Sequence, residues 1–239
     1  TDKMSDFTNS YLQGLGGLSG FIVCAKSPSC GMERVRLYDE KGNRGRKEGT
    51  GLFTGALMET YPWLPVEEDG RLHDPVLREN FVERVFALHE LNMLRANGLT
   101  RHGLLNFHSR YKLQLLAHHQ AGYREIGPFV ASLHQWDDLD AFFVVYREKL
   151  MTILKKPASR KNHTNVLMHI QGYFREQLNT RQRGELRDVI LNYSGGLLPI
   201  LAPLTLLKHY LAEYPDSYLL TQNYFDPYPN DLALRLMIK

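Results

Sequence analysis

The chain has 239 residues, a formal net charge of +3, and 43% hydrophobic and 11% aromatic residues. This composition is sufficient for a packed core and excludes wholesale disorder. No run of about 18 apolar residues occurs, which excludes a membrane-spanning helix, and two cysteines are too few for a disulfide scaffold and predict a cytoplasmic protein.

The segment before residue 72 alternates short elements with turns. Residues 21–25 are apolar and partly β-branched between turn signals, which predicts a buried strand that contains Cys24. A short strand is predicted at 35–38, a mobile glycine-rich loop at 39–50 and a helix at 52–60. The polar stretch Glu67–Gly70 is predicted to be the linker between two domains.

From Asp74 onward the pattern is helical. Asp74 before Pro75 is typical of a helix start, and we expect that helix to end near Gly98. Thr100 is the expected cap of a second helix, and further helices are predicted at 122–132, 137–154, 160–178, 181–193 and 200–213. The predicted fold class is α+β overall: a partial α/β segment at residues 1–72, then an all-α helical bundle at residues 73–239.

The predicted strand at 21–25 runs into Ser27-Pro28-Ser29-Cys30-Gly31. This order places hydroxyls and a thiol at the end of a sheet, where open α/β folds bind their ligands. A lone cysteine in a turn is more often a structural residue than a reactive one. The pattern alone therefore leaves a structural and a functional role open.

The motif Lys26-Ser-Pro-Ser-Cys-Gly31 resembles the signature of the TudS family of thiouracil desulfidases, and the stretch 49–54 resembles that family's glycine-rich continuation. The rest of the chain resembles the YbgA-type helical domain at 107–112, 165–174 and 222–229. The fusion of two such domains is similar to the RudS-like desulfidases, which remove sulfur from 4-thiouridine in tRNA.

The resemblance implies a 4Fe–4S cluster that is held by three cysteines and leaves one iron open to the substrate's sulfur. Cys30 matches the last of these ligands, and Ser27 matches a residue that assists proton transfer. The segment with the other two ligands is missing from this sequence, so we expect the chain to be an inactive part of an enzyme that converts tRNA 4-thiouridine to uridine. Two alternatives stay open: desulfuration of free thiolated bases such as 2-thiouracil, and a non-catalytic module that binds RNA or protein.

Basic residues of the helical segment recur at helical spacing. One set follows the second predicted helix, a second set surrounds the junction at Pro157, and a third shares one face of the next helix. Such faces suit phosphate contacts, although most basic stripes are solvated surface. We predict tRNA as the partner, with neither DNA nor a membrane expected and no indication of oligomeric state. The predicted tRNA contacts are Arg101, His108, Arg110, Lys112, Lys155, Lys156, Arg160, Lys161, Asn165 and His169.

The histidines of the helical segment raise the question of a metal site, and its tyrosines raise the question of stacking on bases. His118-His119 and the pair His163 and His169 lack the spacing of metal ligands on one helix face, so no metal site is expected there. The tyrosines near the C-terminus are predicted to pack in the core rather than to stack on bases. They are Tyr210, Tyr214, Tyr218, Tyr224 and Tyr228.

Overall fold

The computed structural model describes residues 8, 10–38 and 44–237. The chain forms two compact units, Thr1–Met93 and Leu94–Lys239, and the division falls inside helix α3 (Pro75–Ala96). The predicted domain boundary at residues 72 and 73 stays a prediction. The described residues are mostly helical with a few short strands, which agrees with a mixed α+β class.

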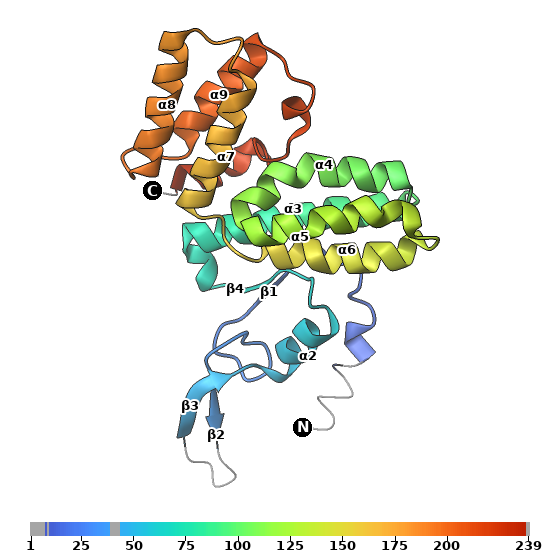
Figure 1. Cartoon of the computed structure of the whole chain (residues 1–239). Coiled ribbons are helices and arrows are strands. Elements are labelled where there is room, and N and C mark those ends of the chain that lie inside the picture. The colour runs from blue at the N-terminus through green and yellow to red at the C-terminus, as the bar shows by residue number, and fades with distance from the viewer. Residues whose placement is uncertain (1–7, 9, 39–43, 238–239) are drawn as a thin grey trace. The chain divides into compact units, whose positions relative to one another are not determined.

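Unit 1 contains two small sheets. Strand β1 (Phe21–Val23) pairs in parallel with β4 (Val66–Glu68), and Val23 lies opposite Glu68. Strand β2 (Val35–Tyr38) pairs antiparallel with β3 (Arg44–Gly49) to form the hairpin seen in Figure 1. Helix α2 (Leu52–Thr60) follows the hairpin, as predicted, and buries Phe53, Thr54 and Leu57.

Three predictions for unit 1 were wrong. Glu67 and Glu68 are not a linker: they belong to β4 and are buried, because the strand is held by its pairing with β1. Cys24 lies beyond the end of β1 and is exposed. Residues 44–49 form β3 instead of a loop, since their partner strand satisfies their backbone groups, whereas residues 39–43 lie outside the described residues.

Unit 2 is helical. Helices α4 (Arg101–His118), α5 (Gln120–Ala131) and α6 (Leu139–Leu154) pack side by side, and α7 (Arg160–Tyr173), α8 (Thr180–Ser194) and α9 (Leu201–Glu213) form a second group (Figure 1). The predicted helices are confirmed, except that α7 ends at Tyr173 rather than near residue 178. Within the described residues, no helix combines the length and apolarity that crossing a bilayer requires.

Short 3₁₀ turns complete the two units, one of them before α3 and the others in unit 2. They are η1 (Arg71–His73), η2 (Ser132–Gln135), η3 (Leu219–Thr221), η4 (Asn230–Leu232) and η5 (Leu234–Met237).

Local capping explains where the first long helices begin. The Asp74 side chain accepts hydrogen bonds from the backbone N–H groups of Val76 and Leu77, at 2.8 and 3.0 Å. Thr100 caps α4 by accepting from Gly103 N. Such caps satisfy backbone donors that have no partner within the helix. Both starts were predicted and are confirmed.

The C-terminal segment is anchored on α4 by Gln222 and by Asn223, whose backbone N–H donates to Arg110 O at 3.0 Å. Gln222 Nε2 donates to Ser109 O at 2.8 Å, and Gln222 Oε1 accepts from Leu113 N at 3.3 Å. The neighbouring Tyr224 is buried in the core of α7, α8 and α9, and so is Tyr210. The prediction that these C-terminal tyrosines pack in the core is confirmed for Tyr210, Tyr224 and Tyr228, all of which are buried.

Candidate functional site

The loop at 27–31 is organised by the Ser27 hydroxyl. Ser27 Oγ accepts hydrogen bonds from Cys30 N at 3.1 Å and from Ser29 N at 3.4 Å. Serine side chains that bond the backbone two or three residues ahead are typical of tight turns. Ser29 Oγ lies 3.2 Å from Ser27 Oγ and 3.5 Å from Cys30 Sγ. The two hydroxyls and the thiol therefore form one hydrogen-bonded series, along which a proton can pass.

This loop rests on the start of α2. Leu52 N donates to Pro28 O at 3.1 Å, and Phe53 N donates to Ser29 O at 2.9 Å. Thr54 Oγ1 donates to Cys30 O at 2.7 Å. The motifs at 27–31 and 49–54, which the sequence singled out separately, thus form one structure. Because loop carbonyls occupy these first amides of α2, they are not available to a ligand.

Two glycines permit this close approach. A Cβ on Gly51 would lie 2.4 Å from the carbonyl carbon and oxygen of Ser29. A Cβ on Gly31 would lie 2.5 Å from Val35 Cγ2 and 2.8 Å from Ser27 O. Backbone atoms cannot rotate away from such contacts, so the loop requires glycine at both positions.

Carboxylates at the end of β4 hold the other side of the loop. Glu68 Oε1 accepts from Met32 N at 2.9 Å and from Glu33 N at 3.3 Å. Asp69 Oδ1 accepts from Ala25 N at 3.1 Å, and this bond is the main reason why the pKa of Asp69 is lowered. Neither carboxylate was predicted, because the polar composition of residues 67–70 indicated a linker. The apolar residues Leu64 and Val66 immediately before it were the signal for a strand.

The resemblance implies an iron–sulfur cluster with three thiolate ligands, and this sequence has two thiols. Cys30 is half-buried in the loop and Cys24 is exposed after β1, and these are the two cysteines of the sequence. A cluster held by three thiolates does not fit the residues of this sequence on their own. Among the described residues, no group of three His, Cys, Asp or Glu is arranged to hold a metal ion.

The predicted basic stripe on α4 is not a surface stripe. His108 is only 4% exposed, and its Nδ1 lies 3.1 Å from Tyr146 Oη. Burial, assisted by Lys112, lowers the pKa of His108 to about 4, so the ring is neutral at pH 7. The prediction that His108 faces outward was wrong, because α4 packs against α5, α6 and α7.

The other predicted residues of α4 differ in exposure. Arg101 is exposed at the start of the helix and donates through Nη2 to Trp136 O at 2.7 Å. Arg110 and Lys112 are half-buried. Of these three cations, Arg101 is the one that is fully exposed.

The junction between α6 and α7 does expose cations. Lys155, Lys156 and Lys161, which we name the junction lysines, are exposed, and so are Asn165 and His169 farther along α7. Lys156 Nζ lies 2.9 Å from His119 Nε2. Within the described part of the chain, no carboxylate forms an ion pair with the junction lysines.

Arg160 has a structural role that was not predicted from the sequence. Its Nη1 donates to Tyr193 O at 2.6 Å and to Leu198 O at 3.5 Å. The guanidinium also lies 4.8 Å from the centroid of the Tyr193 ring. These contacts fix the end of α8 through Nη1, and the role of Arg160 as a tRNA contact stays a prediction.

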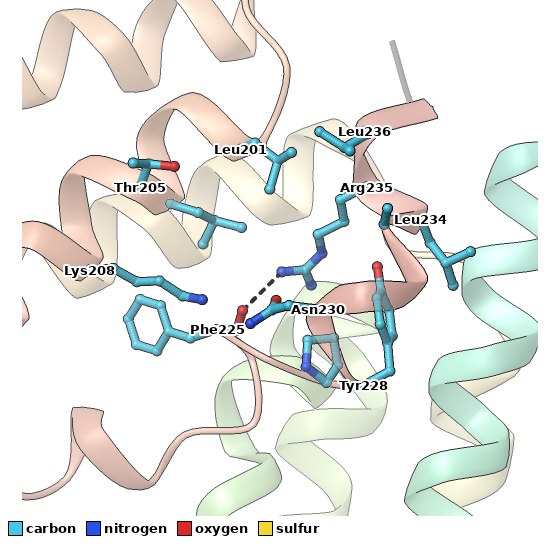
Figure 2. A pocket seen from close by; sticks show the side chains of 12 residues that line it. Leu201, Thr205, Lys208, Phe225, Tyr228, Asn230, Leu234, Arg235 and Leu236 are labelled. Carbon is cyan, nitrogen blue, oxygen red and sulfur yellow. Dashed lines mark hydrogen bonds between the residues drawn. The ribbon is translucent and has the colours of Figure 1, made fainter.

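Figure 2 shows a cavity in unit 2, of about 200 Å³, between α9 and the C-terminal segment. Its walls are mostly apolar, and Lys208 and Arg235 form the cationic part of the lining. Lys208 Nζ pairs with Asp226 at 2.5 Å, and Arg235 Nη1 donates to the carbonyls of Tyr224 and Phe225 at 3.2 and 3.4 Å. Both cations therefore hold the C-terminal segment in place, which accounts for this cavity by packing.

Known proteins match both parts of the chain. Residues 1–69, which include the Ser27–Cys30 loop, match the family described as 2-thiouracil desulfurase. Residues 112–229 match a family described as a protein of unknown function, DUF1722. The "Uncharacterized protein YbgA" of Escherichia coli (strain K12) is 51% identical over 152 residues, which are 64% of this chain and 90% of that protein. No solved structure matches the chain significantly.

Proposed function

The chain belongs to the YbgA family, and from this premise and the desulfurase match of residues 1–69 we propose that it is part of an enzyme that removes sulfur from 4-thiouridine in tRNA. The observation that carries the proposal is the hydrogen-bonded series of Ser27, Ser29 and Cys30. It lies where the carboxyl ends of the parallel strands β1 and β4 meet, the edge at which α/β sheets present their reactive groups.

The reaction exchanges a thiocarbonyl for a carbonyl. Water adds its oxygen to the base and sulfur leaves as sulfide, so one C=S bond and one water become one C=O bond and hydrogen sulfide without net oxidation. In this proposal Ser27 and Ser29 move the protons, and Cys30 supplies one thiolate for the iron–sulfur cluster. The two remaining thiolates would come from cysteines that this sequence does not contain.

Unit 2 is proposed to bind the tRNA. The junction lysines are exposed, and Asn165 and His169 follow Lys161 along the same helix at spacings of one turn. Lysines that neutralise phosphates release counterions, which makes such binding strongly dependent on salt. Arg101, Arg110, Lys112 and Arg160 remain secondary candidates, whereas His108 is buried and is no longer proposed as a contact.

A second candidate function is desulfuration of a free thiolated base such as 2-thiouracil. It is favoured by the description of the family that residues 1–69 match. In that case unit 2 would not touch the substrate, and its junction lysines would be ordinary solvated surface.

The loop is tested with two cysteine variants of the full protein, prepared without oxygen. Cys30→Ser should abolish sulfide release from 4-thiouridine in tRNA, whereas Cys24→Ser, at the exposed thiol, should retain it. Full sulfide release by Cys30→Ser would contradict the proposed role of the loop.

The RNA-binding surface is tested by charge reversal. Lys161→Glu should weaken tRNA binding at low salt and reduce the slope of log K against log salt by about 1 or more. Arg187→Glu, at an exposed position of α8, is the matched control and should change binding little. Equal losses in both variants would show a general charge effect. Unchanged turnover of 4-thiouridine tRNA in Lys161→Glu would show that Lys161 does not bind the substrate, and turnover of free 2-thiouracil without turnover of tRNA would favour the free-base alternative.

A further inference from the structure

Four exposed side chains, which we name the α7 row, follow one another along α7. Lys161, Asn165, His169 and Tyr173 lie four residues apart, and all four are exposed. With a rise of about 1.5 Å per residue, the row extends over about 18 Å of this helix (Figure 1). The sequence of α7 contains no aspartate or glutamate, so no carboxylate of the helix offsets the charge of Lys161.

The C-terminal end of the α7 row is aromatic. The rings of His169 and Tyr173 stand at 89° to each other, with their centroids 5.6 Å apart. Tyr173 also stacks on the half-buried Tyr218, with the centroids 5.7 Å apart and an angle of 20° between the rings. Aromatic side chains mostly fill cores, yet Tyr173 is 38% exposed. The three rings therefore form one aromatic surface that continues the row beyond its cationic start.

Tyr218, which supports this surface, is held in place by its own turn. Asp216 Oδ1 accepts from Tyr218 N at 3.0 Å and from Leu219 N at 2.8 Å, and Thr221 Oγ1 donates to Tyr218 O at 2.7 Å. Burial is the main reason why the pKa values of Tyr173 and Tyr218 are raised, so both phenols are neutral at pH 7. The rings thus have a fixed support and add no negative charge that would repel a phosphate.

Cations beside aromatic rings are the two components of surfaces that bind unpaired nucleic acid. The cations contact phosphates, and successive bases stack on the rings. Inside a duplex the faces of each base are covered by its neighbours, so only an unpaired base can stack on a side chain. A protein partner fits this surface less well, because the cores of protein interfaces are apolar. Among the residues of α7, all of which are described, Tyr173 is the one exposed large hydrophobic side chain.

We propose that the α7 row binds an unpaired segment of RNA, with a phosphate at Lys161 and a base stacked on Tyr173. The proposal rests on the proposed function, in which unit 2 binds tRNA, and it names the part of the RNA that is bound: a loop or a single-stranded end rather than a stem. Every base has a π-face, so stacking of this kind tolerates any sequence. The α7 row can therefore hold RNA molecules that differ in sequence.

The test measures how the full chain binds a short RNA strand and the duplex that this strand forms with its complement. Tyr173→Leu removes the ring, and Tyr173→Phe is the matched control that removes only the hydroxyl. We expect the single strand to bind more tightly than the duplex. Tyr173→Leu should weaken single-strand binding by roughly 5- to 150-fold, because one stacked base is lost, and should leave duplex binding unchanged. Tyr173→Phe keeps the ring and should stay within about twofold.

The salt dependence of binding separates the loss of stacking from a displaced helix. The Tyr173 ring neutralises no phosphate, so the slope of log K against log salt should be the same in Tyr173→Leu as in the unsubstituted chain. Equal affinity for strand and duplex, an equal loss in Tyr173→Phe, or a reduced slope in Tyr173→Leu would overturn the inference. Absence of any RNA binding would also overturn it, and would favour a protein partner for the α7 row.

The outcome is independent of desulfuration. Neither probe contains sulfur, so a failure of the full protein to release sulfide would refute the proposed function and leave this result standing. Conversely, unchanged binding and turnover of 4-thiouridine tRNA by Tyr173→Leu would overturn the inference and leave the proposed function intact.

Discussion

The substitution Gly51→Ala should uncouple the candidate loop from α2. The new Cβ would lie 2.4 Å from Ser29 C and O and 2.7 Å from Cys30 N, roughly 1 Å inside ordinary contact distance. These are backbone atoms, so the whole loop must move away from the helix. The movement lengthens two hydrogen bonds. They run from Leu52 N to Pro28 O and from Phe53 N to Ser29 O, and they measure 3.1 and 2.9 Å in the unsubstituted chain.

The expected loss in the free energy of unfolding follows from these hydrogen bonds and from the added Cβ. Two weakened hydrogen bonds cost about 1 kcal/mol each, and overpacking adds about 1–3 kcal/mol. Alanine regains about 0.4–1 kcal/mol through the unfolded state, because φ of −62° and ψ of 145° at Gly51 suit any residue. Unit 1 should therefore lose about 2–4 kcal/mol.

Gly55→Ala is the matched control on the same helix. Its Cβ would meet only Thr50 Cγ2, at 3.7 Å, so it should stabilise the helix by about 0.5–1 kcal/mol. The chain's two tryptophans, Trp63 and Trp136, lie one in each unit. Urea unfolding followed by Trp63 fluorescence in a Trp136→Phe background therefore reports unit 1. An unchanged midpoint for Gly51→Ala would refute the close packing of the loop.

Three more predictions test the remaining contacts. His108 has a pKa of about 4 when folded and 6.5 when unfolded, so the unfolded chain binds more protons between these values. The free energy of unfolding of unit 2 should therefore fall as the pH drops through this window, by at most about 3 kcal/mol. Urea unfolding at a series of pH values checks this, and His108→Gln should flatten the dependence. Glu68→Ala leaves the half-buried amides of Met32 and Glu33 without their acceptor and should destabilise unit 1 by about 1–3 kcal/mol in the Trp63 assay. Arg160→Met should destabilise unit 2 by about 1–3 kcal/mol, whereas Lys161→Met should stay within about 0.5 kcal/mol in thermal unfolding.

The helices of this protein were predictable because their signals are local. Caps such as Asp74 and Thr100, together with apolar spacing, defined where the helices begin and which residues form their core. The strand β4 was not predictable in the same way. The charges of Glu67 and Glu68 are typical of a solvated linker. Their burial is compensated by the pairing of β4 with β1 and, for Glu68, by hydrogen bonds from the amides of Met32 and Glu33.

The site was predictable to the extent that its motif is contiguous. Ser27 and Cys30 were identified from adjacent residues, and the structure joins them to the separate stretch that begins at Gly49 and Gly51. The carboxylates that support the loop were missed, since their partners lie more than 30 positions away in the chain: Glu68 bonds Met32 with a separation of 36 residues, and Asp69 bonds Ala25 with a separation of 44.

The opposite outcomes on α4 and α7 show what a basic stripe can and cannot indicate. Spacing alone places charged residues on one helix face, but that face is free only if the helix lies at the edge of its bundle. On α4, Leu113 and Leu115 are both buried, although residues two apart point to different sides of a helix. A helix that is apolar on more than one side is a central helix. That signal was present in the sequence, and it explains why the predicted cationic stripe of α4 is less exposed than the junction lysines.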